Sequence, residues 1–147
     1  DILKDEKWDG SQKPLKIEIN SFSFKRGLPD DSSGNGGGFI FDCRGLLNPG
    51  RYEPYKHLTG KDKPVIEFLE TQSLAKDFLE NIYKVIDINI QNYLERDFEN
   101  LQINFGCTGG QHRSVYCAEQ TAKYIKEKYQ IDVQVRHIER VIQGHFI

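Results

Sequence analysis

Residues 106–114, Gly-Cys-Thr-Gly-Gly-Gln-His-Arg-Ser, combine glycines, hydroxyl groups and a guanidinium group in one short segment. Glycines let the backbone close around an anion because they carry no Cβ that would clash with it. Arg113 can make a bidentate contact with phosphate oxygens. Thr108 and Ser114 add hydroxyl donors, and His112 can donate to the anion or cap a helix. A plain strand-to-helix turn is the alternative, but the density of donors favours a phosphate-binding loop.

The same segment also has the spacing of a covalent catalyst. Cys107 and Arg113 form the pattern C-x5-R, followed by Ser114, which resembles the signature of cysteine-dependent phosphatases. A cysteine at a helix N-terminus can have a lowered pKa, which favours the nucleophilic thiolate. However, Gly106 stands where that signature has histidine, and no aspartate is marked as a general acid. We slightly favour the alternative, in which Cys107 is a packed residue at the base of the loop.

Further candidates lie outside the loop. Asp42 and Arg44 are two residues apart at a strand end, where they can contact a ligand or form an ion pair with each other. His137, on the last expected strand, can face the same site or be a structural histidine. Lys25 can extend a basic rim, although a basic residue near a turn is usually only solvated.

The pattern of apolar residues predicts the elements that must hold these side chains. We expect strands over residues 15–20, extending toward 24, and over 38–43, 101–105 and 131–137. Ser73 is a candidate N-cap for a helix over 74–95, Pro64 can open a shorter helix, and another helix follows the loop. Strands that alternate with helices indicate an α/β fold with a mainly parallel sheet flanked by helices. Ligands bind beyond the carboxyl ends of the strands in such sheets, where this loop falls.

Length and composition suit one domain, which we place at residues 15–147 after a lead-in or linker over residues 1–14. Residues 27–38 are rich in turn formers and predict a flexible loop. The connection over 44–63 lacks periodicity, and such long connections are often functional. The first residue is Asp1, which suggests a domain excised from a longer protein.

Charge and cysteine content narrow the function classes. The net charge is −2, whereas a nucleic-acid module usually has a basic excess. An odd count of three cysteines fits a reducing compartment, so we expect a cytoplasmic protein. The Cys and His spacings match no zinc site, and we expect no metal, no cofactor and no membrane partner. The oligomeric state is not determined by the sequence.

The segment Gly-Cys-Thr-Gly-Gly-Gln-His-Arg-Ser-Val at 106–115 closely resembles the hallmark of the RapZ C-terminal domain family. Other stretches resemble that family's motifs and follow in its order: 21–29, 41–44, 48–49, 58–65 and 135–137. The resemblance covers roughly residues 20–140. The chain departs from the family at Gly50, where histidine is frequent, and in an insertion over 34–38.

The resemblance implies an α/β domain related in shape to a phosphofructokinase subdomain, and a sensor for glucosamine-6-phosphate. Transferred by motif, the phosphate contacts would be Thr108, Gly109, Gly110, His112 and Arg113, with Asp42 and Arg44 on the sugar side. The resemblance also implies RNA binding as an adaptor in one branch of the family, whose basic C-terminal tail this chain lacks. Full-length relatives would carry an ATP-binding or kinase-like domain ahead of this one.

The first hypothesis is therefore a regulatory domain that binds a sugar phosphate and is not expected to be an enzyme by itself, within a parent protein that we expect to be a kinase or phosphotransferase. Its ligand-binding residues would be Thr108, Gly109, Gly110, Gln111, His112, Arg113, Ser114, Asp42 and Arg44, followed by His137, Cys107 and Lys25. The second hypothesis is a cysteine phosphatase that uses Cys107 and Arg113. The third is an RNA-binding adaptor.

Overall fold

The computed structural model describes residues 15–142, so the expected lead-in over 1–14 lies outside the described part. Four strands form one sheet: β1 (Lys16–Ser23), β2 (Phe39–Asp42), β3 (Asn100–Cys107) and β4 (Asp132–His137). Their order is β2-β3-β1-β4, and every neighbouring pair is parallel. The expected α/β fold with a parallel sheet is thus confirmed.

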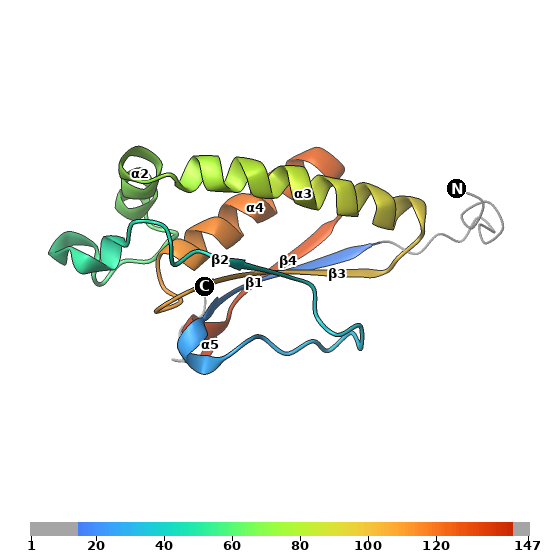
Figure 1. The fold of residues 1–147 in the computed structure, drawn as a ribbon, viewed down its shortest axis with the longest axis horizontal. Helices are drawn as coiled ribbons and strands as arrows, with labels where there is room; N and C mark the ends of the chain where they lie inside the picture. Colours follow the sequence, from blue (N-terminus) through green and yellow to red (C-terminus); the bar gives the residue numbers. More distant parts are fainter. Residues whose placement is uncertain (1–14, 143–147) are drawn as a thin grey trace.

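The helices lie on both faces of this sheet but not equally (Figure 1). On one face lie α2 (Lys63–Gln72), α3 (Ala75–Glu95) and α4 (Arg113–Tyr129). The short α5 (Ile138–Ile142), the 3-10 turn η1 (Phe24–Arg26) and the loop after it lie on the other face. Two further 3-10 turns, η2 (Pro49–Arg51) and η3 (Glu53–Tyr55), occur between β2 and α2.

The core lies between the sheet and the larger helical layer. The inward side chains of β1 and β3 include Ile19, Ile103 and Phe105, all fully buried. They belong to the same apolar cluster as Ile86 of α3 and Ile125 of α4. Burial of each such side chain contributes about 1.5–3 kcal/mol. This packing fixes where the carboxyl ends of the strands lie, and therefore where the loop after β3 is held.

The opposite face of the sheet has a polar centre. Asn20 of β1 and Asn104 of β3 are Cα partners in the sheet, and both are buried. Asn20 Nδ2 donates to Asn104 Oδ1 at 2.9 Å, and Asn104 Nδ2 donates to Gln102 Oε1 at 2.9 Å. Gln102 Nε2 in turn donates to Glu18 Oε2 at 3.1 Å. We call these four residues the polar row.

Three local details differ from the expectation. The strand expected at 101–105 continues to Cys107, because Gly106 and Cys107 pair with Phe22 and Ser23 of β1; the Cys43 N–H also donates to Gly106 O at 2.7 Å. The helix expected from residue 74 begins at Ala75; Ser73 Oγ accepts from its N–H at 3.1 Å and donates to Leu69 O. The loop over 27–38 is organised by Asp31, which accepts from the N–H groups of Ser33 and Gly37. None of the described helices is long and apolar enough to cross a membrane.

Candidate functional site

The segment 107–112 joins the carboxyl end of β3 to the first turn of α4, as Figure 1 shows. Helix α4 begins at Arg113, and no side chain caps its N-terminus. Its first turn also holds no acidic residue. The amides of a first helical turn have no partner within the helix and lie at the positive end of its dipole. The local structure is therefore suited to an anion.

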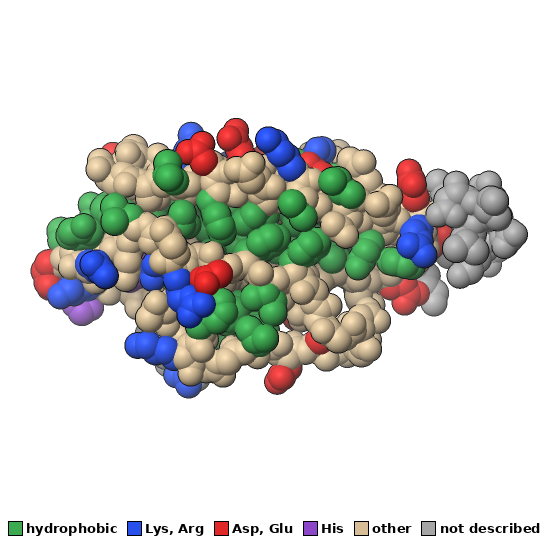
Figure 2. All heavy atoms as spheres, viewed as in Figure 1, with side chains coloured by type: hydrophobic (Ala, Val, Ile, Leu, Met, Phe, Trp, Pro, Cys, Tyr) green, Lys and Arg blue, Asp and Glu red, His purple; other side chains and the backbone are tan. Residues whose placement is uncertain are grey.

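A pocket of about 250 Å³ opens at this loop. Its walls include six of the residues expected to bind a ligand: Cys107, Thr108, Gly109, Gln111, His112 and Arg113. The other wall comes from the connection after β2, with Asn48, Gly50 and Lys56. On the face shown in Figure 2, Lys and Arg side chains gather at this end of the molecule.

Arg113 is buried, with 5% of its surface exposed, and it belongs to no ion pair within residues 15–142. Its Nη1 atom donates to two backbone carbonyls, Arg44 O at 2.9 Å and Leu46 O at 3.0 Å. Its buried Nε atom has no hydrogen-bond partner among the described residues. A buried cation that forms no direct ion pair is costly. An anion at the pocket would form that ion pair.

The two residues before Arg113 attach the loop to the connection after β2. Gln111 Nε2 donates to Lys56 O at 2.9 Å and to Leu58 O at 2.7 Å. His112 Nε2 lies 2.7 Å from Tyr55 O, so this ring nitrogen is used there. Of the two roles expected for His112, anion donor or helix cap, the cap is not formed, because no side chain caps α4. Burial lowers the pKa of His112, an effect that the positive charge of Arg113 reinforces. His112 is therefore neutral near pH 7 and donates through Nε2.

Cys107 lies at the base of the loop, 2% exposed. Its thiol donates to Ser114 Oγ at 3.1 Å, and its sulfur accepts from the Gly110 N–H at 3.3 Å. Ser114 is fully buried and Gly110 does not line the pocket, so these two expected ligand contacts support the loop from beneath. All three cysteines of the chain are free and buried.

Close packing explains two glycines of this region. A Cβ on Gly106 would lie 2.5 Å from the rings of Phe22 and Phe24, so a side chain where the phosphatase signature has histidine would require these rings to move. A Cβ on Gly60 would lie 2.3 Å from His112 O and from the backbone nitrogen of Tyr116. Gly60 also donates its N–H to Gln111 O at 2.9 Å. Both glycines let neighbouring segments approach the loop.

Asp42 and Arg44 form the ion pair that the sequence left as one of two options. The Arg44 guanidinium donates to both carboxylate oxygens, with Nη2 at 2.8 Å from Oδ2, and it stacks 3.9 Å from the centre of the Phe24 ring. The hydrogen bond from Arg44 holds the pKa of Asp42 below its usual range. Both side chains are about half exposed, and neither lines the pocket at the loop. Arg44 is connected to the site through its backbone carbonyl, which accepts a hydrogen bond from Arg113 Nη1.

Two lower-ranked candidates lie apart from the pocket. His137 is buried between Ser21 Oγ, 2.6 Å from its Nδ1, and Glu119 Oε2, 2.7 Å from its Nε2. These two contacts are those of a structural histidine. Lys25 is exposed and does not line the pocket. Among the described residues, no cluster of His, Cys, Asp and Glu could hold a metal ion.

Asn48, Gly50 and Lys56 are pocket residues that reasoning from the sequence did not assign to the site. They lie in the connection after β2, where the sequence has no periodic pattern from which the position of a side chain could be predicted. The Asn48-Pro49 pair in the sequence could have indicated a turn at this position. The Asn48 side chain accepts from the Gly50 N–H at 2.9 Å and thereby starts the turn η2 that faces the loop.

These features define an α/β domain with a glycine-rich loop at the carboxyl edge of a parallel sheet. The sequence profile described as RapZ C-terminal domain matches residues 15–140. The chain belongs to this family. The resemblance that the motifs indicated is thus confirmed.

Curated relatives are named nucleotide-binding proteins. One from Marinobacter nauticus is 35% identical over 139 residues, which are 95% of this chain and 45% of that protein. Others from Actinobacillus pleuropneumoniae and Caldicellulosiruptor saccharolyticus are each 39% identical over 135 residues, 92% and 91% of this chain and 44% of each relative. The chain spans less than half the length of these relatives.

Proposed function

We propose that this domain binds a phosphorylated amino sugar, of the glucosamine-6-phosphate type, through residues 107–113. It would act as a regulatory part of a longer nucleotide-binding protein. The observation that carries the proposal is the buried guanidinium of Arg113, which forms no ion pair within residues 15–142 and lies beside an uncapped helix N-terminus. A phosphate group complements both features at once.

The pocket also has room and polarity for a sugar. Thr108 and Gly109 are exposed at its edge. Lys56 adds a cation at its wall, although its Nζ is paired with Glu53 Oε2 at 3.0 Å. Such a pocket can place hydroxyl groups against the Asn48 side chain while the phosphate faces the α4 amides. The amine would reach Asp42 only if the ion pair with Arg44 opened, because both carboxylate oxygens now accept from Arg44.

Thermal unfolding of the 147-residue chain tests the proposal. Ligand that binds the folded state raises the melting temperature by mass action. We expect glucosamine-6-phosphate to raise it most, glucose-6-phosphate less because it lacks the amine, and glucosamine not at all because it lacks the phosphate. If no sugar phosphate raises the melting temperature, the proposal is wrong.

The Arg113→Ala variant should lose the response to glucosamine-6-phosphate. This variant also leaves two backbone carbonyls without a donor, so its folding must be checked by circular dichroism before titration. Arg96→Ala is the matched control, because Arg96 is exposed and lies at the opposite end of the sheet, between α3 and β3. A folded Arg113→Ala that still responds as the parent does would contradict the role of Arg113.

A second candidate is a cysteine phosphatase, favoured by the two hydrogen-bonding groups at the Cys107 sulfur. In that reaction the thiolate forms a bond to phosphorus as the ester oxygen leaves, and water then cleaves the S–P bond. The leaving oxygen needs a proton, but Arg44 lowers the pKa of Asp42 and so makes it a poor donor. An aryl phosphate that is hydrolysed by the parent and not by Cys107→Ser would establish this activity.

A further inference from the structure

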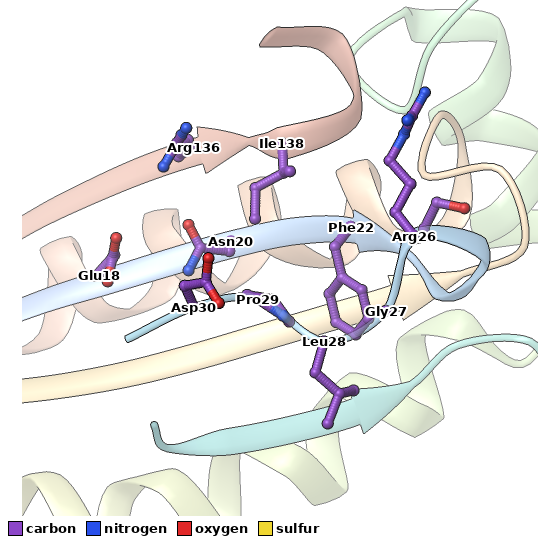
Figure 3. Close-up of a pocket in the computed structure, with 11 residues that line it drawn as sticks. Glu18, Asn20, Phe22, Arg26, Gly27, Leu28, Pro29, Asp30, Arg136 and Ile138 are labelled. Atoms are coloured by element: carbon purple, nitrogen blue, oxygen red, sulfur yellow. The ribbon is translucent and has the colours of Figure 1, made fainter. Parts of the chain in front are cut away.

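A second pocket, of about 290 Å³, lies on the other face of the sheet from α2, α3 and α4. Its floor is formed by β1 and β4, with Glu18, Asn20 and Phe22 on one strand and Arg136 on the other, as Figure 3 shows. Residues 27–30, which follow η1, form its outer wall. Its volume is close to the lower end of the range for ligand pockets, about 300 Å³. It shares no lining residue with the pocket at the glycine-rich loop.

The polar row fixes the orientation of the Asn20 amide. Asn104 Nδ2 donates to Phe39 O and to Gln102 Oε1, so Asn104 can offer only its Oδ1 atom to Asn20. Asn20 must therefore present its Nδ2 group to Asn104. Its Oδ1 atom then faces away from β3, on the side of β4 and Arg136 (Figure 3).

This Oδ1 atom has no hydrogen-bond partner among the described residues, although Asn20 is only 2% exposed. Leaving a buried acceptor unsatisfied is costly, and such atoms are rare in folded proteins. Every other link of the polar row is satisfied, so the unpaired atom is confined to the end of the row that meets the pocket. A ligand that carries a hydrogen-bond donor would satisfy this atom.

The charges around the pocket indicate what that donor is. Glu18 and Asp30 bring two carboxylates, whereas Arg26 is already paired with Glu139 at 2.6 Å. Arg136 and Asp30 have no ion-pair partner within the described part of the chain. Two carboxylates against one unpaired guanidinium favour a ligand that carries an ammonium group and, next to it, an acid group.

The strand register orders these groups along the pocket. Asn20 and Arg136 are Cα partners, so their side chains share one row across the sheet. Glu18 lies two residues before Asn20, and Phe22 lies two residues after it on the same face. The end of the pocket beside Phe22 is apolar. It includes Leu28, whose side chain is 60% exposed and can be covered by a ligand.

We propose that this pocket binds a free α-amino acid with an apolar side chain. The ammonium group would donate to the carboxylates of Glu18 and Asp30, and to Asn20 Oδ1 once neighbouring side chains have shifted to expose that buried atom. The carboxylate would pair with Arg136, and the side chain would lie against Phe22 and Leu28. The spacing of one carbon between the two charged groups of an α-amino acid suits donors and acceptors on adjacent strands.

Amide NMR spectra of the chain titrated with L-leucine test this assignment. We expect saturable shifts at the amides of Asn20, Phe22, Asp30 and Arg136. Glycine should bind more weakly because it has no side chain to cover Leu28. Leucinamide lacks the carboxylate and 4-methylpentanoic acid lacks the ammonium group, so each should bind at least about ten-fold more weakly, since each loses a charged hydrogen bond.

The variants Arg136→Gln and Asp30→Asn change exposed side chains and should fold normally. Each should weaken L-leucine binding by about ten-fold or more, while the matched controls Arg96→Gln and Asp132→Asn should not. If none of the twenty amino acids gives saturable shifts at these amides, or if leucinamide binds as well as leucine, the assignment is wrong. Glucosamine-6-phosphate would shift amides of 108–113 instead, so the two proposals succeed or fail separately.

Discussion

Gly109 and Gly110 are neighbours in the loop, but a Cβ atom would meet opposite surroundings at the two positions. At Gly109 it would have no heavy atom within 4 Å, and the backbone there needs no positive φ. At Gly110, φ is +66°, and a Cβ would lie 2.9 Å from Glu139 Cβ and 3.1 Å from Ser23 N. The variants Gly109→Ala and Gly110→Ala therefore separate a ligand-binding role from a folding role.

The expected magnitudes follow from these contacts. Gly109→Ala should stabilise the ligand-free domain by about 0.4–1 kcal/mol, because alanine restricts the unfolded chain. For a chain of this size that raises the melting temperature by about 1–4 °C. Gly110→Ala should cost about 1–2 kcal/mol for the left-handed backbone, plus about 1–3 kcal/mol for the close contacts.

Urea unfolding measures the stabilities, and titration calorimetry with glucosamine-6-phosphate measures binding. Gly109 lines the pocket, so a methyl group there would hinder the approach of a phosphate to the backbone amides. Gly109→Ala should therefore be at least as stable as the parent and yet bind the sugar phosphate more weakly. If Gly109→Ala is as unstable as Gly110→Ala, or if it binds the sugar phosphate as the parent does, the reasoning about this loop is wrong.

Further predictions concern the supports of the loop. Gly60→Ala should lower the free energy of unfolding by more than about 3 kcal/mol, the upper end of the usual cost of overpacking, because its Cβ would meet backbone atoms of His112 and Tyr116. Urea unfolding measures this change. The lowered pKa of His112 means that the unfolded state binds the proton more tightly, so stability should fall as the pH drops below about 6.5. His112→Gln should flatten that dependence in thermal unfolding across pH 5–8, whereas His57→Gln, at an exposed site, should not. Cys107→Ser should keep sugar-phosphate affinity, measured by calorimetry, if Cys107 only supports the loop.

The elements of this fold could be predicted from the sequence because the apolar pattern is regular where the helices and strands lie. Ile17 and Ile19 alternate with polar residues in β1, and both are buried. The end of β3, which lies two residues beyond the expected one, depended on contacts from distant segments. Gly106 and Cys107 belong to β3 because they pair with Phe22 and Ser23 of β1, and no local pattern encodes that pairing.

The candidate site was predictable in part, for the same reason. The chemistry of residues 106–114 is local, so its types and spacing identified the loop. What each side chain contacts is not local: His112 faces Tyr55 O, and Arg113 faces Arg44 O. The polar row was also invisible in the sequence, because Asn20 and Asn104 are 84 positions apart.

Three consecutive side chains of the loop bind the connection after β2. Gln111, His112 and Arg113 together bond to carbonyls spread over residues 44–58. A phosphate that drew the Arg113 guanidinium toward the pocket would compete with the carbonyls at 44 and 46 for its donors. Under the proposed function, ligand binding therefore acts directly on this connection, and the neighbouring ion pair of Asp42 and Arg44 would be the first surface group to respond. A regulatory signal of this kind would have a short physical route from the loop to the surface, through backbone atoms rather than through the core.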